Sequence, residues 1–201
     1  MLYIFDGLDS LDDAFIGQCI PYLSMERKEK AFSYSFPSDR NCSVLAYMLL
    51  LLALKEIYGI NENVTFKYGK NGKPYLQNYP NIQFNLSHCR AAAACIVAGC
   101  EVGVDVEEIK PVTDDVARRV LTVKEYAEYK ASSNPDELFC GYWTAKESWL
   151  KKTGLGIGID LSALAAEDTG EKTLVRGKNY FCCATGASVM VKNVDIGGLI
   201  V

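Results

Sequence analysis

The chain lacks several features that mark other classes of protein. Its 21 Lys and Arg are outnumbered by 25 Asp and Glu, so at a net charge of −4 it has no broad basic face for nucleic acid. Its first ten residues show no basic start and no cleavage pattern of a signal peptide, and the longest apolar run, residues 44–54, is too short to span a bilayer. We therefore expect a cytoplasmic protein without nucleic-acid or membrane partners.

Cysteine is present, but not in the patterns of a zinc site or a disulfide framework. None of the eight cysteines belongs to a CxxC pair, Cys182 and Cys183 are adjacent, and most lie in apolar strings such as AAAACIVAGC, residues 91–100. This usage favours reduced, buried thiols.

The remaining pattern, in a chain that is 49% apolar, mixes helices with neighbouring strands and predicts an α+β fold. No low-complexity linker or internal repeat marks a domain boundary. The NG pair at residues 71–72 favours a turn with positive φ, and Gly59 is a typical helix end. We expect strands at 2–5, 81–88, 91–99 and 101–109, helices at about 40–58, 114–131 and 136–153, and short β segments after the glycine-rich stretch 154–158. The strand at 81–88 should be half-buried, because its apolar residues alternate with Gln83, Asn85 and Ser87.

The stretch GVDVEEIK, residues 103–110, carries a pair of carboxylates on one face of a strand. Asp105 and Glu107 stand at i and i+2, roughly 7 Å apart at Cα, with valines on the opposite face. Two carboxylates at this spacing can share one Mg²⁺, which completes its shell with water and phosphate oxygens. On spacing alone, a solvated face of an edge strand is the simpler interpretation.

A second motif, WTAKESWLKKTG at residues 143–154, places Glu147 and Lys151 at i and i+4 on one helical face, with Lys146 beside them. A surface ion pair would explain this spacing without any function. Lys146 should point elsewhere on the helix.

The third motif, NLSHC, ends a strand with Ser87 and His88, the only histidine in the chain. Nucleophilic catalysis by Ser87 is disfavoured because adjacent strand residues point to opposite faces and no GxSxG elbow is present. His88 can be either a structural residue or a phosphate contact.

Together and in this order, the motifs resemble the 4'-phosphopantetheinyl transferase superfamily, in its surfactin-synthetase-type branch. The resemblance runs from about residue 20 to 165 and rests on GKPYL, FNLSH, GVDVEE and WTAKESWLKKTGLGI, with ARRVLTVKEY between them. About a hundred residues precede the GxD strand, which fits the monomeric branch better than the short trimeric synthases. The resemblance implies two similar α+β halves about a pseudo-twofold axis, residues 1–100 and 101–201, with coenzyme A in the cleft and the metal-binding carboxylates in the second half.

The activity implied by the resemblance is transfer of the phosphopantetheine arm of coenzyme A to a serine of an apo acyl or peptidyl carrier protein, releasing 3',5'-ADP. Asp105, Glu107 and Glu147 would hold Mg²⁺, with Mn²⁺ as an alternative metal. Glu147, directly or through water, would accept the proton of the carrier serine. Lys151 would offset negative charge on the diphosphate.

The resemblance also implies residues that bind coenzyme A. Lys73 would lie along the nucleotide, and Ser87 and His88 would contact phosphates, with His88 nearest the 3'-phosphate. Arg27 and Lys30 would add positive charge at the mouth of the cleft, although a solvated helix start explains them equally well.

One departure concerns the 3'-phosphate. Where relatives usually place an arginine, this chain has Cys42. Arg40 is the candidate substitute, although i and i+2 face different directions on a helix.

Two other functions stay open at this point. One is a metal-dependent diphosphate hydrolase that uses the same carboxylates, and the other is a non-catalytic coenzyme A or carrier-binding protein. We expect a carrier protein to bind a partly apolar groove near residues 114–131.

Overall fold

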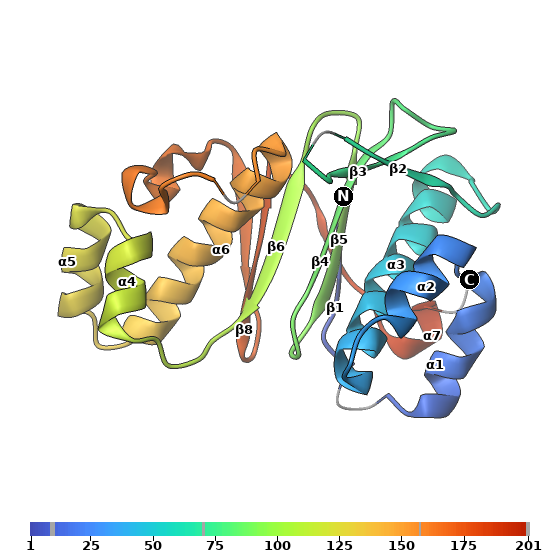
Figure 1. The fold of residues 1–201 in the computed structure, drawn as a ribbon, viewed down its shortest axis with the longest axis horizontal. Coiled ribbons are helices and arrows are strands. Elements are labelled where there is room, and N and C mark those ends of the chain that lie inside the picture. The colour runs from blue at the N-terminus through green and yellow to red at the C-terminus, as the bar shows by residue number, and fades with distance from the viewer. Residues whose placement is uncertain (9–10, 70, 157, 200–201) are drawn as a thin grey trace.

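The computed structural model describes residues 1–8, 11–69, 71–156 and 158–199, and it confirms the α+β class (Figure 1). Two main sheets stand side by side in the middle of the molecule, with α1, α2 and α3 outside one of them and α4, α5 and α6 outside the other. The helices are α1 (Asp13–Cys19), α2 (Met25–Phe32), α3 (Pro37–Tyr58), α4 (Asp114–Val120), α5 (Val123–Ala131), α6 (Pro135–Thr153) and α7 (Ile196–Leu199), and the short 3-10 turns are η2 (Ile20–Tyr22), η3 (Leu161–Ala163) and η4 (Ala166–Thr169). The strands are β1 (Leu2–Phe5), β2 (Phe66–Tyr68), β3 (Pro74–Leu76), β4 (Gln83–His88), β5 (Ala93–Ala98), β6 (Gly103–Glu108), β7 (Lys172–Arg176), β8 (Tyr180–Thr185) and β9 (Val191–Asn193).

The first sheet, in the order β4-β5-β1-β9, is covered by the long helix α3. The expected helix at 40–58 is confirmed, and it begins at Pro37, whose missing N–H costs nothing in the first turn. It ends at Gly59, which adopts a φ of 68°. Among the described helices only α3 is long and apolar enough to cross a membrane. The sequence did not indicate this, because the uninterrupted apolar run at 44–54 is much shorter than the helix that contains it. Since 67% of that window is buried inside the protein, α3 has the burial of a core helix.

The second sheet, in the order β6-β8-β7, is covered by α6. Gly103 at the start of β6 lets the helix backbone approach closely. A Cβ at this position would lie 2.0 Å from the carbonyl oxygen of Ser148 and 2.3 Å from the backbone nitrogen of Lys152. The absent side chain therefore sets how near α6 can lie to β6.

The single helix expected at 114–131 is wrong, because two helices occupy this range. Leu121 is extended, and Thr122 starts α5 with a capping box. The Thr122 hydroxyl accepts the backbone N–H of Glu125, at 3.2 Å, and the Glu125 carboxylate accepts the N–H of Thr122, at 2.9 Å. These bonds satisfy N–H groups that a continuous helix would have bonded to its own carbonyls.

The two sheets meet face to face. The valines of residues 102–106 are buried against Leu2, Ile4 and Ile96 of the first sheet. The strand expected at 81–88 is confirmed as β4, but the expectation that it is half-buried is wrong, since Asn85 and Ser87 on its polar face are buried as well.

The neighbouring strand β6 explains this burial. The backbone N–H of Val104 donates to the side-chain oxygen of Asn85 at 2.9 Å, and that of Val106 donates to the Ser87 hydroxyl at 3.2 Å. Polar side chains of one half therefore bond the backbone of the other half, and they join β4 to β6.

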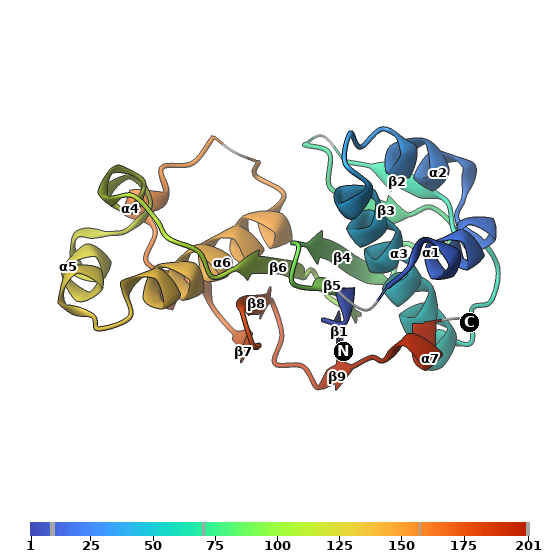
Figure 2. The same ribbon diagram turned by 90° about the horizontal axis from the view of Figure 1, so that it is seen from below.

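The proposed division at residues 100/101 falls between β5 and β6, where the chain passes from one sheet to the other. The end of the chain returns to the first half, because β9 pairs in parallel with β1 and α7 contacts α3, as Figure 2 shows from below. Two of the expected turns are partly described. Gly72 has the positive φ expected of the NG pair, at 81°, whereas Lys70 in the same turn and Ile157 in the stretch 154–158 lie outside the described residues.

Candidate active site

Asp105 lies at the centre of the site, on β6 and only 2% exposed. Its Oδ1 accepts the Lys151 ammonium at 2.5 Å and the Ser87 hydroxyl at 3.1 Å. Its Oδ2 is buried and has no hydrogen-bond partner among the described residues. An unpaired carboxylate oxygen in a protein interior costs free energy unless another group binds it, so this atom points to a ligand.

Glu107 and Glu147 flank Asp105 from β6 and α6. Burial, and after it the charge of Asp105, raises the pKa of each of these carboxyls. Trp143 packs against the core between α4, α5 and α6, and it donates its indole N–H to Glu107 at 3.3 Å. No hydrogen bond is found for the Glu147 side chain within the described part of the chain, and Lys151 counters its charge.

These carboxylates suit a divalent cation. The carboxylates of Asp105, Glu107 and Glu147 repel one another, and Lys151 is the cation that lies among them. The buried Oδ2 atom of Asp105 has no hydrogen-bond partner among the described residues. Among the described residues, no cluster of three or more Cys, His, Asp or Glu side chains has the spacing of a complete metal site. Mg²⁺ commonly takes only one or two protein carboxylates and completes its shell with water and phosphate, so the donor set fits this metal.

Ser87 is held on the carboxylate side of β4. Its oxygen accepts the Lys151 ammonium at 2.9 Å and the N–H of Val106, while its hydroxyl donates to Asp105. Ser87 is buried, and His88 lies on the opposite face of β4 and cannot reach its hydroxyl, so the argument against a Ser-His nucleophile stands.

His88, on the opposite face of β4, lines a pocket of about 600 Å³. Burial lowers the pKa of its imidazole to about 4, and the positive charges of Lys151, Arg27 and Lys30 act in the same direction. The ring is neutral at pH 7. The other described residues that line this pocket are Tyr34, Asp39, Cys42, Cys89, Arg90, Glu107, Glu108 and Lys110.

Lys73 lines a second pocket, of about 310 Å³, together with Asn85, Glu147 and Lys151. Its ammonium donates to the carbonyl oxygens of Val102, at 3.2 Å, and Lys152, at 2.5 Å. The β2–β3 hairpin is thereby tied to the end of α6, beside the carboxylates.

The predicted cations of the first half lie in different places. Arg27 is only 5% exposed, so neither the cleft mouth nor a solvated helix start describes it: its Nη2 donates to the carbonyl and hydroxyl of Ser43, each at 3.0 Å. Lys30 is exposed and contributes to the field at His88. Arg40 forms an ion pair with Asp13 at 3.7 Å and is not among the described residues that line the His88 pocket.

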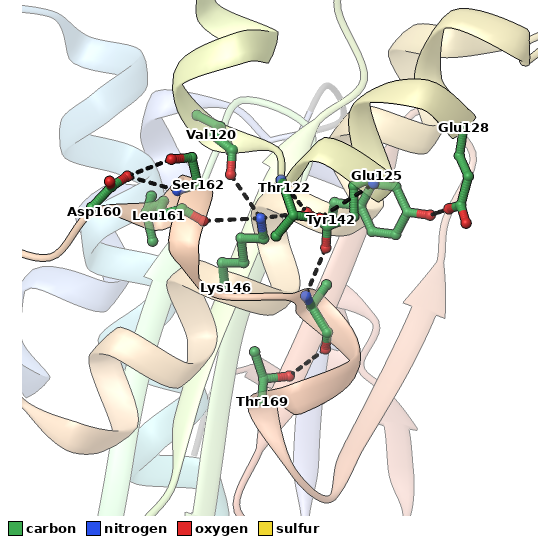
Figure 3. A network of polar contacts seen from close by, with 11 residues as sticks. Val120, Thr122, Glu125, Glu128, Tyr142, Lys146, Asp160, Leu161, Ser162 and Thr169 are labelled. Atoms are coloured by element: carbon green, nitrogen blue, oxygen red, sulfur yellow. Dashed lines mark hydrogen bonds and ion pairs between the residues drawn. The ribbon is translucent and has the colours of Figure 1, made fainter.

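Lys146 points away from the candidate metal ligands and into a buried polar network, which is shown in Figure 3. It is 0% exposed, and its ammonium donates to the carboxylate of Glu125 at 2.6 Å and to the carbonyls of Val120 and Leu161. Burial acts to raise the pKa of Glu125, but the N–H of Ala166, the Lys146 ammonium and the N–H of Thr122 outweigh it and hold that pKa below its usual value. The network ties α4, α5 and the 3-10 turns to α6, next to Glu147.

Sequence reasoning missed three residues that shape the site. Asn85 looked like an outward-facing strand residue, and only the position of β6 gives it a backbone partner. Trp143 gave no signal of its contact with Glu107. Glu125 could have been found, because TVKE before a helical pattern is the signature of a capping box.

Comparison with known proteins follows the two halves of the chain. Residues 101–191 match the family described as the 4'-phosphopantetheinyl transferase superfamily, and residues 13–101 match the family described as 4'-phosphopantetheinyl transferase, N-terminal. The two matched ranges meet at residue 101.

Curated relatives carry the same description. A 4'-phosphopantetheinyl transferase of Bacillus subtilis is 31% identical over 71% of this chain, and the chain spans 65% of its length. 4'-Phosphopantetheinyl transferase psf-1 of Bacillus pumilus is 32% identical over 79% of this chain and 70% of its own length. Among solved structures, a holo-[acyl-carrier-protein] synthase of Thermotoga maritima aligns with 22% identity over 42% of this chain and 60% of its own, at a TM-score of 0.34.

Proposed function

Because the chain belongs to the 4'-phosphopantetheinyl transferase superfamily, we propose that it transfers the phosphopantetheine arm of coenzyme A to a serine of an apo acyl or peptidyl carrier protein. The observation that carries this proposal is the site at Asp105. A buried carboxylate with one unsatisfied oxygen lies against Lys151, with Glu107 and Glu147 beside it, in a protein of this family.

Asp105, Glu107 and Glu147 would hold the metal, for which Mg²⁺ is the first choice and Mn²⁺ the second. When bound, the ion supplies Lewis-acid stabilisation of the diphosphate. The protein contributes a fixed geometry, since Ser87 and Lys151 hold Asp105 and Trp143 holds Glu107.

Glu147 is the proposed base for the hydroxyl of the carrier serine. Burial and the charge of the neighbouring Asp105 raise the pKa of the Glu147 carboxyl. This change brings the pKa closer to neutral pH, where a general base is most effective. Lys151, four residues along α6, lies where it can counter the charge that develops on the diphosphate.

Coenzyme A would occupy the two pockets on either side of these groups. Lys73 lies in one beside Glu147, and His88 lies in the other beside Glu107. Lys30 would add positive potential near His88. Ser87 would act through Asp105 and Lys151 and not through the open pocket, because it is buried between them.

The carrier protein would dock beside Glu107, on the face that carries α4. A largely apolar groove of about 340 Å³ opens there, close to the helix where we expected carrier binding. The described residues that line it are Glu107, Glu108, Lys110, Pro111, Val112, Thr113, Val116, Phe139, Cys140 and Trp143. A monomer acting in the cytoplasm completes the proposal.

The experiment is to incubate the protein with coenzyme A, Mg²⁺ and apo carrier proteins, and to look by intact-mass spectrometry for one added phosphopantetheine group. Asp105→Ala should abolish transfer with the fold retained, whereas Glu171→Ala, an exposed carboxylate before β7, should transfer normally. Cleavage of the diphosphate without a carrier would identify a hydrolase. Binding without any transfer across several carriers would identify a binding protein.

A further inference from the structure

Arg90 lies in the short connection between β4 and β5, directly beside the proposed coenzyme A site. The strands pair up to His88 and Ala93, and the N–H of Cys89 donates to the carbonyl of Ala92 at 2.9 Å. The backbone of Arg90 is therefore held at a defined place next to His88, while its side chain is exposed.

The Arg90 side chain lines the His88 pocket and has no hydrogen bond or ion pair with any described residue. The other arginines near this end of the protein are engaged. Arg27 is bonded to Ser43, and Arg40 is bonded to Asn41, paired with Asp13 and placed over the ring of Phe32. Arg90 is thus a free cation at the pocket.

Cys42 faces the same pocket but brings no positive charge. Its thiol donates to the carbonyl of Cys89 at 3.4 Å, and burial raises its pKa to about 11, so it stays neutral. Arg90 lies close enough for its charge to act on this thiol. The guanidinium of Arg90 therefore lies near Cys42, the position at which relatives usually place an arginine.

The charges around the pocket define what it needs. Lys110 is the second cation on its lining, opposed by Asp39, Glu107 and Glu108. Glu107 belongs to the proposed metal site, and Glu108 accepts a bond from Asn179 at 3.3 Å. A phosphomonoester, with a charge of about −1.5 to −2 at pH 7, requires a permanent cation, and neutral His88 cannot supply one. A guanidinium matches it with two parallel N–H donors.

We infer that Arg90 binds the 3'-phosphomonoester of coenzyme A in this protein and replaces, from the β4–β5 connection, the cation that Cys42 does not provide on α3. The inference rests on the proposed function, because it assumes that coenzyme A is the ligand of this cleft.

The test compares two ligands that differ only in this group. Binding of coenzyme A and of 3'-dephospho-coenzyme A, each with Mg²⁺, is measured by calorimetry on the full chain. Arg90→Ala should weaken binding of coenzyme A by about 10- to 100-fold, the range for a hydrogen bond to a charged group, and change that of the dephospho form by less than about twofold. Arg90→Lys should restore part of the loss. Arg119→Ala, an exposed arginine on α4, is the matched control and should change neither.

Equal losses for the two ligands, or no loss for either, would overturn the assignment of Arg90. The proposed function has a separate readout, the mass shift of the carrier. Selective loss of coenzyme A affinity without any transfer by the wild type would support Arg90 and reject the transferase. If the wild type binds neither ligand, both ideas fail.

Discussion

Replacing Lys146 by methionine removes one partner of an ion pair that is sealed from water. Lys146 is 0% exposed and Glu125 is 4% exposed, and their charged atoms lie 2.6 Å apart. Methionine fills much of the same volume but leaves the Glu125 carboxylate in the interior, where its remaining hydrogen-bond donors among the described residues are the N–H groups of Thr122 and Ala166. Loss of one partner of a buried pair costs about 3–5 kcal/mol, a large part of the ~5–15 kcal/mol that stabilises a typical domain.

The free energy of unfolding should be measured by urea denaturation. For a chain of this length, the expected loss corresponds to a fall of roughly 6–20 °C in Tm. Lys124→Met is the matched control: its ion pair with Glu167 has a similar distance, 3.1 Å, but both side chains are about two thirds exposed, at 66% and 65%. Because both of its charges are in contact with water, that control should unfold at nearly the same urea concentration as the wild type.

Lys146 and Glu125 should also behave as a coupled pair. Adding Glu125→Gln to Lys146→Met removes the uncompensated charge, so the double variant should be more stable than the sum of the single effects by about 1–3 kcal/mol. A loss below ~1 kcal/mol for Lys146→Met, or strictly additive effects, would show that the pair does not carry the stability that its burial implies.

Three further predictions concern the site and its support. Gly103→Ala should cost about 1–3 kcal/mol or more and greatly weaken Mg²⁺ and coenzyme A binding, because the new methyl group meets the backbone of α6; wild-type binding in this variant would show that α6 can shift without harm. His88, as the single histidine, gives an isolated NMR signal that should titrate near pH 4, and a midpoint near 6.5 would contradict the assigned burial. Between pH 6.5 and 4 the imidazole of His88 is protonated in the unfolded state but not in the folded state, so the free energy of unfolding should fall as the pH falls through this window. Denaturation at pH 7 and pH 5 measures this effect, which should be absent from His88→Gln. Thr122→Ala should cost about 1 kcal/mol in a thermal melt through loss of the α5 cap, whereas Ser133→Ala, at an exposed serine beyond the end of α5, should have little effect.

Much of the site was predictable because its chemistry lies in short, local patterns. A strand presents Asp105 and Glu107 on one face whatever surrounds it, and a helix presents Glu147 and Lys151 on one face for the same reason. Helix ends at Gly59 and Gly154, both left-handed, also follow from local sequence. These features need only the periodicity of the backbone and the conformational freedom of glycine.

The position of Arg40 shows where local reasoning stops. The family resemblance made it the candidate phosphate contact, but its ion pair is with Asp13, on a separate helix. Arg27 was likewise expected near solvent and is buried against Ser43, which is on α3. Both outcomes depend on which helix packs where, and no short stretch of sequence contains that information.

By itself, the sequence determined most of the helices and strands, the faces on which the carboxylates lie and the family of the protein. Only the tertiary structure decided that β6 lies beside β4, so that Asn85 and Ser87 become buried links between the halves, and that Lys146 faces Glu125 and not the site. The physical reason is that burial and pairing are properties of two surfaces in contact. A carboxylate on a strand is a solvated edge or a metal ligand according to what packs against it, and at Asp105 the partners are Ser87 and Lys151, from two other elements.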